Sequence, residues 1–119
     1  MSMRDEQVLL RDMLTASQRA VAEIQGRDVY ELASDHVRTL GLVKCLEIIG
    51  EAANRLGNDF HSRHETIPWK QIIGMRNRLI HAYFDIDHEQ IWKTLTEDLP
   101  PLIEAIAAIL SDEYGDRLE

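Results

Sequence analysis

The chain has 119 residues, of which 13 are Lys or Arg and 21 are Asp or Glu, so its formal net charge is −8. This length predicts a single domain over residues 1–119, with a flexible tail at about 115–119. One cysteine excludes an intrachain disulfide, and no Cys/His framework for zinc is visible. No apolar run approaches the roughly 20 residues of a membrane span, and the charged N-terminus predicts no secretory leader, so we expect a cytoplasmic protein without membrane contact. At face value, the negative charge argues against a nucleic-acid partner.

The first half of the chain predicts two helices. Apolar residues at steps of three and four indicate an amphipathic helix over residues 4–25. A second helix, capped by Ser34 or Asp35, runs to Leu56, where a Gly-Asn pair ends it. This helix is apolar around most of its circumference, which is typical of the central helix of a bundle. The polar residues 58–66 then predict a loop.

The second half predicts further helices. Pro68 suits the first turn of a third helix, whose path past His81 stays open. Asp87, followed three residues later by Gln90, resembles a capping box for a fourth helix, which the prolines at 100–101 must kink or end. No stretch shows sustained period-two alternation. We therefore expect an all-α fold, an antiparallel bundle of four to five helices.

The negative charge is unevenly distributed. Residues 1–60 balance to −3 and residues 84–119 to −8, whereas residues 61–83 carry four basic side chains and one acidic one, a balance of +3. This middle segment is the only place where the chain could meet a polyanion, because screening limits exposed charges to a reach of about 8–10 Å. The plainer interpretation is that these cations form an ordinary solvated face.

The segment 76–83 concentrates two guanidinium groups, an amide, an imidazole and a phenol. On a regular helix, Arg76 and His81 lie ~140° apart. Asn77 and His81 share a face, so the amide could orient the ring. Two geometries could bring Arg76 and His81 to one phosphate: either the helix unwinds near His81, or two chains each contribute a copy of the segment to one cleft.

This set of side chains suits RNA cleavage without a metal. Histidine titrates near neutrality, so His81 can take a proton from a ribose 2′-hydroxyl or give one to the leaving 5′-oxygen. Arg76 can stabilise the charge that develops on the scissile phosphate, and Tyr83 could bind a phosphate or stack on a base. Attack by the 2′-oxygen would leave a 2′,3′-cyclic phosphate, which makes RNA the expected substrate. Residue types like these are also common as purely structural groups near a helix end.

The same residues carry a family resemblance. The order Arg, four residues, His, any residue, Tyr maps onto Arg76, His81 and Tyr83, with the polar Asn77 after the arginine. This pattern resembles the HepT-like branch of the HEPN superfamily. Three flanking blocks resemble the same family: its central helix, its approach to the active site and its exit, at residues 46–53, 67–77 and 83–87.

The resemblance implies a toxin of a type VII-like toxin–antitoxin pair, with a minimal nucleotidyltransferase (MNT) as antitoxin. It implies a HEPN-like bundle that forms a homodimer, with the motif helices of two subunits lining one RNA cleft. The toxin would be a metal-independent endoribonuclease with Arg76 and His81 as catalytic residues, Asn77 and Tyr83 as supporting residues, and no cofactor. In this family the antitoxin can transfer AMP to the motif tyrosine, here Tyr83, and the added negative charge would repel RNA.

Other candidate groups are weaker. Arg78 and Lys70 are possible phosphate contacts, although Arg78 could equally be a solvated neighbour of the motif. His61 and His64 have the spacing of helical metal ligands, but they lie in a predicted loop without a third ligand. We therefore expect solvated histidines there and no metal site. Trp69 predicts a packing anchor, with base stacking as the alternative.

Two glutamates lie four residues apart on the predicted central helix. Glu47 and Glu51 could face the cleft, or Glu51 could pair with Arg55 four residues on, and we favour the ion pair. The main alternative to a ribonuclease is a non-catalytic helical module that binds a nucleotidyltransferase. A purely structural dimeric bundle is a third possibility.

Overall fold

The computed structural model describes residues 1–82 and 85–116, with only the backbone of His81 and Ala82. Its elements in chain order are helices α1 (Met3–Glu23), α2 (Val29–Ser34), α3 (His36–Arg63), α4 (Trp69–Ile73) and α5 (Met75–Leu79), strands β1 (Ile80–Ala82) and β2 (Asp85–Ile86), helix α6 (His88–Lys93), the π-helical turn η1 (Thr94–Asp98) and helix α7 (Leu99–Tyr114).

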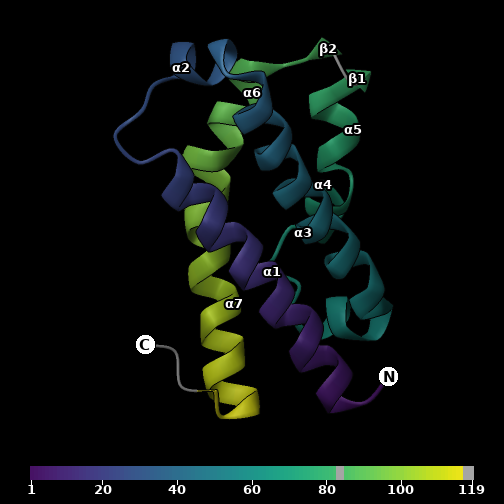
Figure 1. The fold of residues 1–119 in the computed structure, drawn as a ribbon. Helices are drawn as coiled ribbons and strands as arrows, with labels where there is room; N and C mark the ends of the chain where they lie inside the picture. The colour runs from purple at the N-terminus through teal and green to yellow at the C-terminus, as the bar shows by residue number, and fades with distance from the viewer. Residues whose placement is uncertain (83–84, 117–119) are drawn as a thin grey trace.

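The long helices form an antiparallel bundle. Helix α1 packs against both α3 and α7 and runs opposite to each of them, so the two termini lie at the same end of the molecule (Figure 1). Helices α4 and α5 cover the other side of α3, and the two short strands lie beyond α5. The predicted all-α bundle is thus confirmed.

Apolar side chains from all the long helices meet in one core. Leu10 and Met13 of α1, Ile49 of α3 and Leu110 of α7 have no exposed surface, and Ile91 of α6 joins them. Burial of each such side chain stabilises the fold by about 1.5–3 kcal/mol. The three- and four-residue spacing that predicted α1 therefore marks its buried face.

The helix starts follow the predicted caps. The Asp35 carboxylate accepts a hydrogen bond from the backbone N–H of Arg38 (3.0 Å) and begins α3. The Asp87 carboxylate accepts one from the N–H of Gln90 (3.1 Å) and begins α6. These bonds satisfy amides that the first helical turn leaves unpaired. Helix α2, with Asp28 as its cap, was not predicted.

The predicted loop over residues 58–66 is wrong for most of its length. Gly57 does break the helix, with φ +86° and ψ 170°, but the chain resumes helical geometry and α3 continues to Arg63. Phe60, at 1% exposure, is buried in the core and ties this last part of α3 to the bundle. The polar residues around Phe60 therefore belong to a helix that this buried aromatic side chain packs against the core.

The predicted third helix is divided into two short helices. Gly74 separates α4 from α5, and Ile80 adopts an extended conformation (φ −133°, ψ 113°) that ends α5. Strands β1 and β2 then pair antiparallel with an irregular register, which the sequence did not predict. The N–H of Asp87 donates to the carbonyl of Leu79 (2.9 Å) and closes this excursion. The chain therefore leaves helical geometry at Ile80, one residue before His81.

The prolines at 100–101 lie in the first turn of α7, directly after η1. A proline lacks the N–H of a regular helical bond, and the wider π-helical turn accommodates this loss without ending the helical path. The sequence predicted a kink or an end at these prolines, and the structure places a π-helical turn directly before them. Within the ranges that the structure describes, no helix is both long and apolar enough to cross a membrane.

Candidate active site

The motif segment is positioned by a close approach of α4 to α3. A Cβ atom on Gly50 would lie 3.2 Å from the carbonyl oxygen of Ile72 and 3.4 Å from that of Ile73. Only a residue without a side chain fits such a contact comfortably. Gly50 therefore allows the end of α4 to lie on α3, and α5 begins directly beyond this contact.

Arg76 of α5 reaches back to α3. Its Nε donates to Oε1 of Glu47 at 2.7 Å, and Nζ of Lys44 lies 3.9 Å from the other oxygen of the same carboxylate. The Arg76 and Glu47 side chains are 41% and 29% exposed. An ion pair this accessible contributes only about 0–1 kcal/mol to stability, because water and salt screen it. Its main consequence is geometric, since it fixes where Arg76 lies.

The sequence missed this partner of Arg76. The predicted ion pair between Glu51 and Arg55 does not form within the described part of the chain, and the glutamate one turn earlier pairs instead across two helices. A local rule for residues four apart favoured Arg55. The contact of Glu47 with Arg76 depends on the close approach of α4 at Gly50. The two partners are 29 positions apart in sequence. Gly50, within the block at residues 46–53, was the available signal in the sequence that another backbone lies close to α3.

The backbone around His81 bears on the first of the two geometries left open, an unwound helix. Helix α5 ends at Leu79 and His81 lies in β1, so the chain unwinds before the histidine. The expectation that Asn77 shares a helical face with His81 is therefore wrong, because no helix connects them. Asn77 itself is exposed on α5, while Tyr83 lies outside the described residues.

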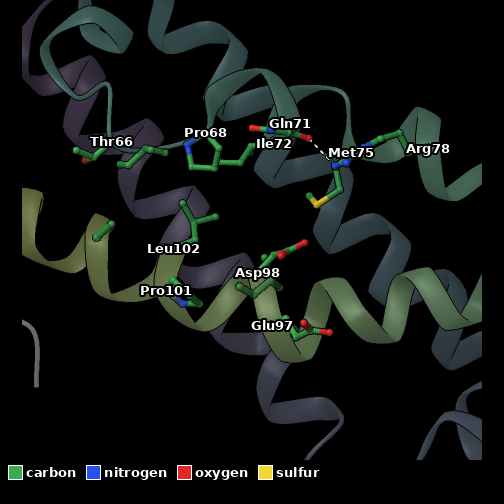
Figure 2. Close-up of a pocket in the computed structure, with 13 residues that line it drawn as sticks. Thr66, Pro68, Gln71, Ile72, Met75, Arg78, Glu97, Asp98, Pro101 and Leu102 are labelled. Carbon is green, nitrogen blue, oxygen red and sulfur yellow. Dashed lines mark hydrogen bonds between the residues drawn. The ribbon is translucent and has the colours of Figure 1, made fainter.

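Arg78 lies on another face of α5. Two helical positions separate it from Arg76, a rotation of about 200°. Its Nη2 donates to the carbonyl of Gln71 at 2.9 Å, at the rim of a pocket of about 490 Å³ between α4–α5 and η1–α7 (Figure 2). Glu97 and Asp98 line the opposite side of this pocket. Arg78 therefore lies away from the Arg76–Glu47 contact in this chain.

The other cations of the middle segment are dispersed as well. Lys70 is exposed and lines, as Asn54 of α3 does, a separate hollow. Arg63 lies at the far end of α3, where its Nη2 contacts Oε2 of Glu6 at 2.7 Å. Burial and a hydrogen bond to Glu6 raise the pKa of Tyr114, in the same cluster, to about 12. The four basic side chains of residues 61–83 therefore do not form one basic patch on a single chain.

His61 and His64 are not the solvated loop residues that we expected. The His61 ring stacks on Trp69, with centroids 4.6 Å apart, and its Nε2 lies 2.7 Å from the carbonyl of Ala53. The His64 ring contacts Phe60. Trp69 is only 6% exposed, as the prediction of a packing anchor requires. Among the described residues, no group of three His, Cys, Asp or Glu side chains could hold a metal ion.

Comparisons with known proteins bear on this arrangement. A family model described as "Ribonuclease HepT-like" matches residues 13–109. "Putative RNase TTE0752" of Caldanaerobacter subterraneus is 34% identical over 93% of this chain and 99% of its own length. "Putative RNase MJ1380" of Methanocaldococcus jannaschii is 34% identical over 92% of this chain and all of its own length.

A third relative is more similar over a shorter stretch. "Probable ribonuclease HepT" of Thermococcus cleftensis is 46% identical over 57% of this chain and 62% of its own length. No solved structure matches significantly. A model match over most of the chain, together with relatives aligned over nearly their full length, identifies the family: the chain belongs to the HepT-like ribonucleases.

Proposed function

We propose that this protein is a metal-independent endoribonuclease and the toxin of a type VII-like toxin–antitoxin pair with an MNT-type nucleotidyltransferase. The observation that carries the proposal is the position of Arg76. In a member of a ribonuclease family, this motif arginine is fixed against α3 by Glu47, five positions before a motif histidine in a non-helical segment. A phosphate near both side chains would meet a cation and a group that titrates near neutrality.

The reaction follows from these two groups. His81 takes the proton of the ribose 2′-hydroxyl as that oxygen forms a bond to phosphorus, or it gives a proton to the 5′-oxygen as the bond to that oxygen breaks. Arg76 stabilises the negative charge that develops on the phosphate. The products are a 2′,3′-cyclic phosphate and a 5′-hydroxyl, and no water is consumed in this step.

A second copy of the chain fits an exposed face of α3. Val37, Leu40 and Ile48 are 80%, 38% and 37% exposed, and Lys44 and Glu51 lie on the same face at steps of three and four. We name these five residues the α3 face. Large apolar side chains exposed together in this way are typical of a protein–protein contact.

The charges on the α3 face are self-complementary. If two α3 helices pack antiparallel about a twofold axis at Ile48, Lys44 of each copy lies next to Glu51 of the other, and the two Ile48 side chains meet at the axis. Glu47 adjoins Ile48 in sequence, so the two Arg76 side chains would flank the same axis. This packing would concentrate positive charge that is dispersed on one chain, and it supports the proposal of one RNA cleft between two subunits.

Ile48→Glu should separate the proposed dimer. Two like charges at the axis cost several kcal/mol, so the dissociation constant should rise at least about 100-fold. Sedimentation equilibrium measures this change, and RNA cleavage per chain should fall with the fraction of dimer. Val8→Glu is the control, because Val8 is an apolar residue that is 53% exposed on another helix, α1. Equal dimer affinity in both variants would rule out this interface.

Tyr83 is the proposed site of AMP transfer. With ATP and the cognate nucleotidyltransferase, the protein should gain mass in steps of one AMP and lose RNA cleavage, since each phosphate adds negative charge beside Arg76 and His81. Tyr83→Phe should remove the mass gain, because it deletes the accepting hydroxyl. Intact-protein mass spectrometry checks this outcome. A Tyr83→Phe protein that still gains AMP would place the modification on another residue.

The direct test of the proposed function compares two substrates. The purified protein should cut single-stranded RNA in the presence of EDTA and leave DNA of the same sequence intact, because only RNA carries the attacking 2′-hydroxyl. A protein that binds a nucleotidyltransferase tightly but cuts no RNA would instead support the non-catalytic module.

A further inference from the structure

We infer that Glu47 is the positioning residue for Arg76, an inference that rests on the proposed ribonuclease function. Glu47 is on α3 and carries none of the motif chemistry, yet its carboxylate holds the motif arginine at 2.7 Å. It would set the direction of the guanidinium group toward a scissile phosphate and would not touch the RNA itself.

Glu47 contacts Nε of Arg76, and this atom controls the orientation of the guanidinium group. The orientation of a guanidinium plane depends on rotation about the bond between Cδ and Nε. A carboxylate that accepts from Nε restricts this rotation, and so fixes where the terminal Nη groups lie. Arg76 comes from a five-residue helix bounded by Gly74 and the extended Ile80, which gives it little support of its own. The contact with the long helix α3 supplies that support.

The charge of Glu47 makes its role testable, because two effects of its removal have opposite signs. Loss of a carboxylate makes the surroundings of Arg76 more positive, so RNA should bind as tightly as before or more tightly. Loss of positioning should slow the chemical step, since a displacement of about 1 Å can cost about 100-fold in rate. A residue that only repels RNA, or that only sequesters Arg76, would give faster cleavage when removed.

The chain contains a matched control pair. Nε of Arg38 donates to Oε1 of Glu23 at 2.8 Å, the same contact between the same atom types, between α3 and the end of α1. Glu23→Ala therefore removes an equal charge and an equal hydrogen bond away from Arg76. Any general effect of charge or of a lost ion pair should appear in this variant too.

The kinetic experiment measures kcat and KM for RNA cleavage in Glu47→Ala, Glu47→Gln and Glu23→Ala. Glu47→Ala should lower kcat about 10- to 100-fold with KM unchanged or reduced. Glu47→Gln should recover part of kcat, because its amide oxygen can still accept from Nε. Glu23→Ala should match the wild type. A Glu47→Ala protein with wild-type or higher kcat would overturn the inference.

A second measurement does not depend on activity. The Nε–H signals of Arg76 and Arg38 can be followed by ¹⁵N NMR. Glu47→Ala should move the Arg76 signal and speed its exchange with water while the Arg38 signal stays, and Glu23→Ala should do the reverse. If the wild type cuts no RNA, the proposed function fails while this measurement still tests the contact. An Arg76 signal that does not change in Glu47→Ala would contradict the inference that Glu47 positions Arg76.

Discussion

His81→Ala should reduce the rate of RNA cleavage by about 10²–10⁴-fold, the range that a positioned general acid or base contributes. The strand β1 carries the histidine outside any helix, so the substitution does not change a residue within a helix. KM for RNA should change little, because the proton transfer belongs to the transition state and not to binding. Single-turnover cleavage of a labelled oligoribonucleotide in EDTA measures this loss.

The control for this variant is another histidine. His88→Ala changes the first residue of α6, which lies after β2 and outside the motif, and it should cleave RNA as the wild type does. Circular dichroism should show the same helix content in both variants. A His81→Ala protein as active as His88→Ala would show that His81 has no catalytic role.

Arg76→Ala should lower kcat about 10²–10³-fold, the cost of removing one preorganised group that stabilises developing charge. It should also raise KM, because it leaves the Glu47 carboxylate beside the RNA phosphates without its cation. The pair is partly exposed and contributes only about 0–1 kcal/mol, so its loss alone should hardly move the thermal midpoint. Steady-state kinetics with a melting curve separates these effects.

Two further variants sharpen the Arg76 prediction. Arg76→Lys keeps the charge but lacks both the planar fork and the Nε donor for Glu47, so its kcat should stay well below that of the wild type. Arg76→Ala combined with Glu47→Ala should restore KM but not kcat. Wild-type kcat in Arg76→Lys would mean that any cation suffices and that orientation does not matter.

Much of the bundle could be predicted because its signals are local. The spacing of apolar residues marks the buried face of α1, and single carboxylates at Asp35 and Asp87 begin α3 and α6. The end of α3 was hidden because polarity was a poor guide there: His61 and His64 are packed by their rings against Trp69 and Phe60. Polar rings that pack by stacking do not produce the three- and four-residue spacing of apolar residues that marks a buried helical face.

The residue types of the candidate site could be read from the sequence, whereas the contacts between them could not. The order of Arg76 and His81 could be read directly, and unwinding near His81 was one of the two geometries left open; Ile80 is already extended. The partner of Arg76 could not be read from spacing, because Glu47 depends on the close approach of α4 at Gly50. Long-range contacts of this kind form through tertiary packing, which no local rule describes.

The basic side chains of the middle segment also lie differently from what the sequence suggested. The positive balance of residues 61–83 covers the motif segment, yet Arg63 and Arg78 face different parts of the molecule from Arg76. A single chain therefore offers RNA little concentrated charge. Two copies paired through the α3 face would bring two Arg76 side chains together, so cleavage should depend on dimer formation and weaken with salt.

The chemistry of the cleaved ends tests the central claim most directly. Wild-type protein and an oligoribonucleotide, incubated in EDTA, should give 2′,3′-cyclic phosphate and 5′-hydroxyl ends by mass spectrometry, because the neighbouring 2′-oxygen is the nucleophile. Ends with a 5′-phosphate and a 3′-hydroxyl, or cleavage abolished by EDTA, would contradict an RNA cleavage carried by Arg76 and His81 alone.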